Sequence, residues 1–155
     1  MNKVLILCDS MAVWYLPIKQ HSSKVDFEKL YAKIMDGRKG SAVLYVTLDP
    51  CKDSSFFLER LSKMPWEVRT KVSYESDTSP KSVSWIREME VEAKDRVDEF
   101  DTLVLVSGSR RFCDLAEEMH DLGKKVESWC FSDDLDGELS ASVDVIEFLD
   151  SSVLM

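Results

Sequence analysis

The chain has 155 residues, 45% of them hydrophobic, which suffices for one globular domain with its own core. Its formal net charge of −9 argues against general affinity for nucleic acids, because nucleic-acid binders usually carry a basic surface. No apolar run approaches the roughly 20 residues that span a bilayer, and none resembles a signal peptide. We therefore expect a single cytoplasmic domain over residues 1–155, with no membrane partner and with its four scattered cysteines reduced.

The first half of the chain alternates apolar runs with helical patterns. Val4–Cys8 is a continuous apolar run, typical of a strand that is covered on both faces. Ser23 and Asp26 have the spacing of a capping box, which predicts a helix from this point. Ala42–Leu48 is a second apolar run, and after a short helix Trp66–Val72 alternates as a half-buried or edge strand does.

The second half continues the same alternation. Apolar residues at helical spacing predict a long helix over residues 86–97, and Leu103–Val106 is a fourth buried strand. Lys125–Phe131 predicts a fifth strand, residues 132–136 an acidic loop, and Val143–Leu149 a last strand. This order of elements predicts an α/β fold, a three-layer sandwich with a mainly parallel central sheet of five to six strands.

The turn after the fourth strand is the strongest candidate site. The strand ends in Ser107-Gly108, and a helix begins a few residues later. In a parallel sheet such a turn lies at the carboxyl end of a strand, where ligands bind. Metal enzymes usually place Asp there, whereas this chain has Ser109, Arg110 and Arg111. These residues predict an anionic ligand; the alternative is that the arginines are ordinary solvated surface charges.

Six short patterns occur in a fixed order over nearly the whole chain. They are Leu5-Ile-Leu-Cys-Asp9, Val13-Trp-Tyr15, Lys81-Ser-Val-Ser84, Val106-Ser-Gly-Ser-Arg-Arg-Phe112, Leu122-Gly-Lys-Lys-Val126 and Val143-Asp144. Together they resemble the NYN domain, a PIN-like nuclease group that includes the LabA-like proteins. The resemblance implies a PIN-like, Rossmann-like fold with the first and fourth strands at its centre.

The acidic cluster of that family is degenerate here. The resemblance places it on Asp9 and on positions that hold Ser84, Ser109 and Arg111 in this chain. Mg²⁺ or Mn²⁺ would need several oxygen ligands, and Glu88 lies about 6 Å further along its predicted helix than Ser84. We therefore expect no catalytic residue, no metal and no cofactor at these positions. Instead, Arg111 is expected to pair with Asp9 where a metal would otherwise bind.

Three functions are compatible with these observations. The preferred one is an inactive NYN/PIN-like domain, a pseudo-nuclease with a binding or regulatory role. It would bind a protein or RNA through Ser109, Arg110, Arg111 and Lys81. The second is an active ribonuclease with a rearranged acidic site, in which Asp9 would hold Mg²⁺ or Mn²⁺. The third is a small acidic regulatory or inhibitory protein that uses its acidic surface; the run 133–138 is then a docking surface rather than a solvated loop. Whether the chain forms a homodimer stays open.

Overall fold

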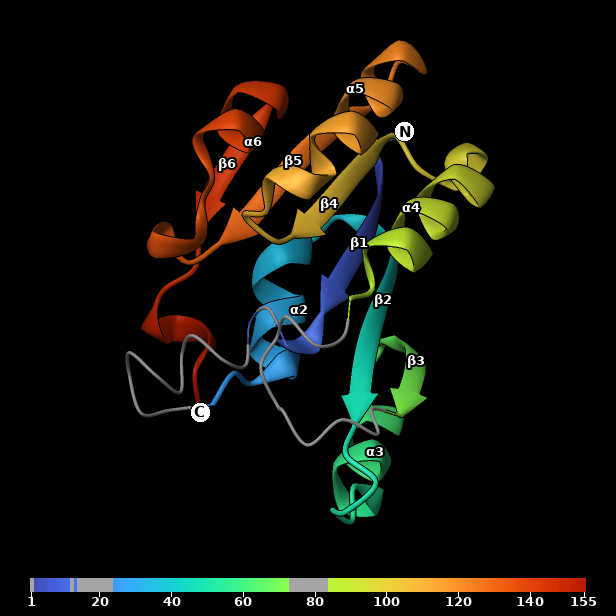
Figure 1. Ribbon diagram of the computed structural model, residues 1–155, viewed down its shortest axis with the longest axis vertical. Helices are drawn as coiled ribbons and strands as arrows, with labels where there is room; N and C mark the ends of the chain where they lie inside the picture. The colour runs from blue at the N-terminus through green and yellow to red at the C-terminus, as the bar shows by residue number, and fades with distance from the viewer. Residues whose placement is uncertain (1, 12, 14–23, 73–83) are drawn as a thin grey trace.

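The computed structural model describes residues 2–11, 13, 24–72 and 84–155. Its centre is a six-stranded sheet in the order β3-β2-β1-β4-β5-β6, and every neighbouring pair is parallel (Figure 1). The strands are β1 (Lys3–Asp9), β2 (Lys39–Leu48), β3 (Glu67–Val72), β4 (Thr102–Val106), β5 (Lys125–Cys130) and β6 (Val145–Phe148). This confirms the expected fold class and the central position of the first and fourth strands.

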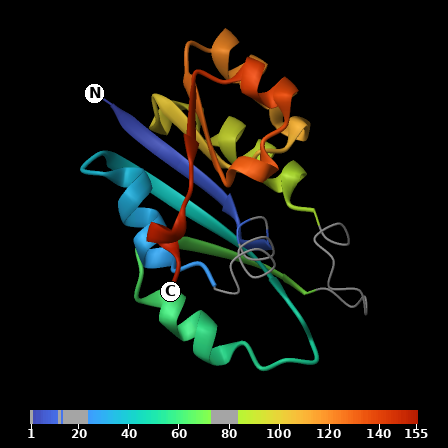
Figure 2. The ribbon, with the colours of Figure 1, turned by 90° about the vertical axis from the view of Figure 1, so that its left-hand side faces the viewer.

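Helices cover both faces of the sheet (Figures 1 and 2). The helices of the described residues are α2 (Phe27–Met35), α3 (Ser55–Ser62), α4 (Ile86–Asp95), α5 (Cys113–Asp121) and α6 (Gly137–Ser142), with four short 3₁₀ helices, η1 (Val97–Glu99), η2 (Arg110–Phe112), η3 (Ser132–Asp134) and η4 (Ser151–Val153). One core cluster joins the sheet to α2, α3 and the C-terminal residues, and the other joins it to α4, α5 and α6. The molecule is therefore the three-layer sandwich that the sequence predicts.

The position of β1 between two helix layers explains why the run Val4–Cys8 is apolar throughout. Val4, Ile6 and Cys8 belong to the core under α2, whereas Leu5 and Leu7 belong to the core under α4 and α5. All five side chains are at most 1% exposed. Successive side chains of a strand point to opposite faces, so a strand with a helix layer on each side has no polar positions.

Several boundaries differ by a few residues from those expected, among them those of α2, β2 and α4. The N-cap of α2 is Asp26, whose carboxylate accepts the N–H groups of Glu28 and Lys29; Ser23 lies outside the described residues. Strand β2 begins at Lys39, before the expected Ala42, and Gly40 pairs with Val4 of β1. An added Cβ at Gly40 would lie 1.8 Å from the Val4 carbonyl oxygen, so the strands can pair here only with glycine at this position. The long helix ends at Asp95, and Val97 starts a separate 3₁₀ turn.

The strand order reverses between β1 and β4. These strands run side by side in parallel register, with Cys8 opposite Val106, and the chain leaves the sheet just after both residues. In open α/β sheets, ligands bind in the crevice outside the carboxyl ends of the strands at such a switch point. The fold thus brings Asp9 and the Ser107–Arg111 turn to the same edge.

Candidate functional site

The turn after β4 is built around Gly108. This residue is buried, and an added Cβ would lie 2.4 Å from the main-chain carbonyl oxygen of Asp134 and 2.7 Å from its carbonyl carbon. The N–H of Asp136 donates to the Gly108 carbonyl at 2.9 Å, and the Ser128 hydroxyl donates to the Ser107 carbonyl at 2.7 Å. The segment after β5 is therefore held against the turn, and only glycine permits this approach.

Two serine hydroxyls fix the course of the turn. The Ser109 N–H donates to Ser107 Oγ at 3.1 Å, and the Arg111 N–H donates to Ser109 Oγ at 3.2 Å. Ser109 thereby caps η2, which leads directly into α5, while Phe112 anchors the turn in the core at 2% exposure. The Ser109 hydroxyl keeps its own hydrogen as a donor for a ligand, because it acts as an acceptor in this cap.

Arg110 and Arg111 are exposed at the start of this helical segment. Neither guanidinium forms an ion pair with another residue of the described part of the chain. Guanidinium groups offer five donors in a planar fork that matches carboxylate and phosphate groups. The turn therefore presents two unneutralised cationic groups at the switch point.

Asp9 ends β1, next to this turn. It is partly buried, and its Oδ1 accepts the N–H of Met11 at 3.0 Å, which turns the chain after the strand. Burial raises the pKa of the neighbouring Cys8 thiol well above its usual range, and the charge of Asp9 adds to this effect. Asp9 thus places a partly buried carboxylate at this edge of the sheet.

The expected pair between Asp9 and Arg111 is wrong. No ion pair joins these two residues, although the structure describes both of them. The Ser109 cap draws the Arg111 backbone into η2, and the Arg111 side chain is exposed there instead of covering the partly buried Asp9. The charge of Arg111 is consequently left available to a partner.

Ser84 lies at the same edge of the sheet but over different strands. It precedes α4, where its Oγ accepts the N–H of Ile86 at 3.3 Å. The next residue, Trp85, donates its Nε1–H to Thr47 of β2 at 3.0 Å, and Lys71 of β3 donates to the Ser84 carbonyl at 3.4 Å. Ser84 is therefore positioned over β2 and β3, whereas Asp9 and Ser109 follow β1 and β4.

Glu88 is not available to replace a missing ligand. Its carboxylate accepts a hydrogen bond from Lys71 Nζ at 2.7 Å, and this contact is the main reason that the pKa of Glu88 lies below its usual value. The same ammonium lies 4.3 Å from the centre of the Trp85 ring. Glu88 thus belongs to the contact that holds the start of α4 on the sheet.

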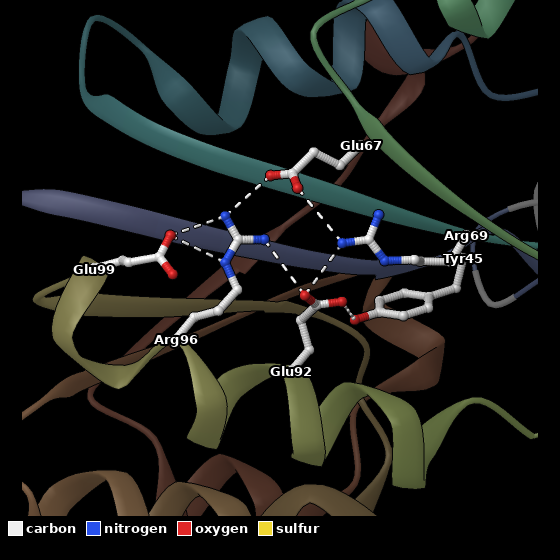
Figure 3. A network of polar contacts seen from close by, with 6 residues as sticks. All are labelled: Tyr45, Glu67, Arg69, Glu92, Arg96 and Glu99. Carbon is white, nitrogen blue, oxygen red and sulfur yellow. Dashed lines mark hydrogen bonds and ion pairs between the residues drawn. The ribbon is translucent and has the colours of Figure 1, made fainter.

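A larger charged network holds the rest of α4 on β2 and β3 (Figure 3). Glu92 is its centre: it accepts from the buried Tyr45 hydroxyl at 3.0 Å and forms ion pairs with Arg69 at 3.3 Å and Arg96 at 3.5 Å. Glu67 and Glu99 complete the network through Arg96, at 3.0 and 3.1 Å. Burial, followed by the charge of Glu92, raises the pKa of Tyr45, so this residue stays a neutral donor.

Asp134 is a feature of the site that the sequence did not reveal. It was expected in a solvated acidic loop, but it is only partly exposed in η3, and its main chain contacts Gly108. Burial raises its pKa from 3.8 to about 6, with a smaller contribution from the charge of Asp133. The signal that could have revealed it is the pair of apolar neighbours, Phe131 and Leu135, which are buried and partly buried.

The remaining predicted positions add no group of metal ligands to this edge. Among the described residues, no group of three or more His, Cys, Asp or Glu side chains could hold a metal ion. Lys81, the remaining predicted contact, lies outside the described residues. Asp144, which matched the last family pattern, lies before β6 and accepts from His120 and from the Val126 N–H, away from the switch point.

The six-stranded parallel sheet defines the class of the protein as an α/β domain with a PIN-like fold. A comparison with family models matches the NYN domain over residues 3–151, so the chain belongs to the NYN domain family. A protein of unknown function from Vibrio parahaemolyticus has a similar crystal structure, with a TM-score of 0.86 at 21% identity over 99% of this chain and 96% of the other. No curated protein matches this sequence.

Two further properties bear on the expectations from composition. All four cysteines are free thiols: Cys8 and Cys130 are buried, Cys113 is intermediate and Cys51 is exposed. In the described part of the chain, no helix has the length and apolar character needed to cross a membrane.

Proposed function

We propose that this NYN domain is a binding module without nuclease activity, and that its switch-point edge recognises an anionic group of an RNA or a protein partner. The observation that carries the proposal is the pair of exposed guanidiniums, Arg110 and Arg111, at the ligand edge of the sheet. Ser109 lies beside them as a hydroxyl donor, and Lys81 is a further predicted contact.

The loss of catalysis follows from the chemistry of the same positions. A Mg²⁺- or Mn²⁺-dependent nuclease uses the metal to activate water and to stabilise the developing charge, and the metal needs several oxygen ligands. Asp9 supplies one carboxylate, whereas Ser84 and Ser109 use their hydroxyls as backbone acceptors. A guanidinium at position 111 also repels a divalent cation.

The alternative function is an active ribonuclease with a rearranged acidic site. Asp134 is a partly buried acid whose main chain lies against Gly108, and burial raises the pKa of its carboxyl group. In that case Asp9 and Asp134 would hold the ion. The alternative predicts cleavage of RNA that is lost in both Asp9→Ala and Asp134→Ala.

The cleavage assay decides between these functions. End-labelled single-stranded and hairpin RNAs are incubated with the purified protein and Mg²⁺ or Mn²⁺, with Asp9→Ala as the matched preparation. We expect the same background in both samples. Cleavage by the unsubstituted protein that Asp9→Ala abolishes would replace the binding module with the ribonuclease.

Binding is measured by the fluorescence anisotropy of a labelled single-stranded RNA at several salt concentrations. Removing both guanidiniums, in Arg110→Ala with Arg111→Ala, is expected to reduce the slope of log K against log salt by up to about 1.4. The control removes two exposed lysines at the opposite edge of the sheet, Lys3→Ala with Lys39→Ala. Equal losses in both variants would mean that the RNA contacts the protein without using the switch point.

If the unsubstituted protein binds no RNA, the anionic group belongs to a protein. Affinity capture with the unsubstituted chain and with the Arg110, Arg111 variant then compares the two sets of retained proteins. A partner that is retained by both variants equally would contradict the proposed role of these arginines.

A further inference from the structure

The sheet carries a groove on the face opposite α4 and α5. It has a volume of 580 Å³ and lies between the C-terminal part of α2 and strands β5 and β6. The β5 and β6 residues that line it, Glu127, Trp129, Val145 and Glu147, alternate along their strands and so project from the same face. The switch-point site uses none of these residues.

Three of the residues that line the groove, Arg38, Glu127 and Trp129, are held together by hydrogen bonds. Arg38 forms a two-point contact with Glu127, at 2.7 and 3.2 Å, and also donates to the Ile34 carbonyl at 2.6 Å. Trp129, which is 8% exposed, donates its Nε1–H to Glu127 at 2.9 Å. The charges of Arg38 and Glu127 therefore cancel, and the indole ring is held in place.

The remaining charged groups of the groove do not balance one another. Lys33 is already paired, because its Nζ lies 3.4 Å from Asp150 and donates to Ser152 at 2.9 Å. Asp36 and Glu147 are exposed on opposite sides of the groove and form no ion pair with any other described residue. The two unmatched groups are thus both carboxylates, which favours a cationic occupant.

The groove adjoins an open edge of the sheet. Strand β6 is the last strand, and no described segment pairs with its outer side. Val145 is 36% exposed, and Glu147 lies opposite Trp129 in the parallel register. An edge strand of this kind can accept an extended peptide, whose main chain forms hydrogen bonds while alternate side chains enter neighbouring pockets.

We propose that β6 and this groove bind an extended basic segment of a partner protein. The segment adds to β6 as a further strand and places a Lys or Arg side chain in the groove. The apolar stem of that side chain packs against Val145 and Trp129, and its charge lies between Asp36 and Glu147. The net charge of −9 assists the encounter with a basic partner.

The probe for this site is an acetylated and amidated hexapeptide of alternating lysine and valine, with a glutamate–valine hexapeptide as its control. Binding is followed by amide chemical shifts in the ¹⁵N-labelled protein. We expect saturable shifts at residues 145–148 with the lysine peptide only. Glu147→Lys should weaken binding by about fivefold or more, because it replaces an attraction by a repulsion. Glu117→Lys makes the same charge change on exposed α5 and should bind as the unsubstituted protein does.

Three outcomes would overturn the proposal. Equal weakening by Glu147→Lys and Glu117→Lys would reveal general electrostatic attraction, and shifts centred away from β6 or no saturation would exclude this edge. A concentration-dependent dimer in sedimentation velocity that Glu147→Lys abolishes would assign the edge to a second copy of the chain. The Arg110, Arg111 variant should bind the peptide normally, so this proposal is tested independently of the switch-point site.

Discussion

Two regions over the sheet use charged residues in opposite ways. Over β2 and β3, acidic and basic side chains are partnered with one another: Lys71 with Glu88, and Arg69 and Arg96 with Glu92. Over β1 and β4, Arg110 and Arg111 are exposed without a described ionic partner. The first region holds a helix on the sheet, whereas the charges of the second region are exposed and, in the proposed function, meet an anionic ligand.

This comparison contrasts charges that are paired with one another under α4 with charges that are exposed after β4. Glu92 has a side chain that is 17% exposed, and its partner Arg96 is 14% exposed, so removing one partner would leave the other charge partly buried. Removing an exposed arginine leaves no such group behind. Substitutions on the two sides should therefore differ in kind, with losses of stability on one and losses of binding on the other.

The largest effect is expected at the turn itself. In Gly108→Ala the new Cβ would overlap the Asp134 main chain, so the segment after β5 must move; we expect a loss of about 2 kcal/mol or more in the free energy of unfolding. Gly137→Ala is the matched control, because no atom lies within 4 Å of its added Cβ. Urea unfolding of both variants measures the difference. Equal midpoints would show that the turn does not depend on this close approach.

The network under α4 should give the next largest effect. Glu92→Ala removes the acceptor of the buried Tyr45 hydroxyl and one partner each of Arg69 and Arg96, at an expected cost of about 2 kcal/mol. Glu99→Ala removes a carboxylate of the same network whose side chain is 57% exposed, and should cost less than about 0.5 kcal/mol. Thermal and urea unfolding of the two variants test the ranking. A Glu99 variant as unstable as the Glu92 variant would contradict the central role of Glu92.

A smaller effect depends on pH. The pKa of Asp134 is raised in the folded protein, from 3.8 to about 6, so the folded state binds more protons than the unfolded state between these values. The contribution of this group to stability is therefore favourable at low pH, falls as the pH rises from about 4 to about 6, and stays low above that range. Asp134→Asn should remove this dependence and raise stability at pH 7 by at most about 1 kcal/mol, after allowance for its partial exposure.

The measurement compares the urea midpoints of the unsubstituted protein and Asp134→Asn from pH 4 to pH 7. Asp133→Asn, an exposed neighbour, is the control and should change the slope less. A difference between the unsubstituted protein and Asp134→Asn that stays constant over this range would mean that Asp134 does not titrate there.

The smallest effect is the coupling between Asp9 and Arg111. Because no ion pair joins them, Asp9→Asn and Arg111→Ala should be additive within about 0.3 kcal/mol in a double-mutant cycle. Urea unfolding of the two single variants and the double variant gives the coupling free energy. A coupling free energy above about 1 kcal/mol would show that Asp9 and Arg111 do interact, and would contradict the proposed role of Arg111 in ligand binding.

Much of the architecture was predictable from the local pattern. The continuous apolar run of β1 and the alternation of β3 depend on the periodicity of a single strand, and each was placed within a few residues. The β1–β4 edge followed from the alternation of strands and helices together with the order of the family motifs. The strands and helices follow from residues that are close in sequence, and the edge follows from the order of these elements along the chain.

Hydrophobic periodicity and connection rules act along the chain, so the amino-acid sequence was enough to predict the parallel α/β sheet, and the family resemblance implied that the first and fourth strands lie at its centre. The pairing of the charged side chains, in contrast, depends on how the elements pack. Glu88 pairs with Lys71 from another strand, Arg111 leaves Asp9 because a serine cap turns its backbone away, and Asp134 is partly buried because Gly108 admits its main chain. Such partners lie far apart in sequence, or their contact requires distances that are correct to within a few tenths of an ångström. Only the packed fold sets these distances.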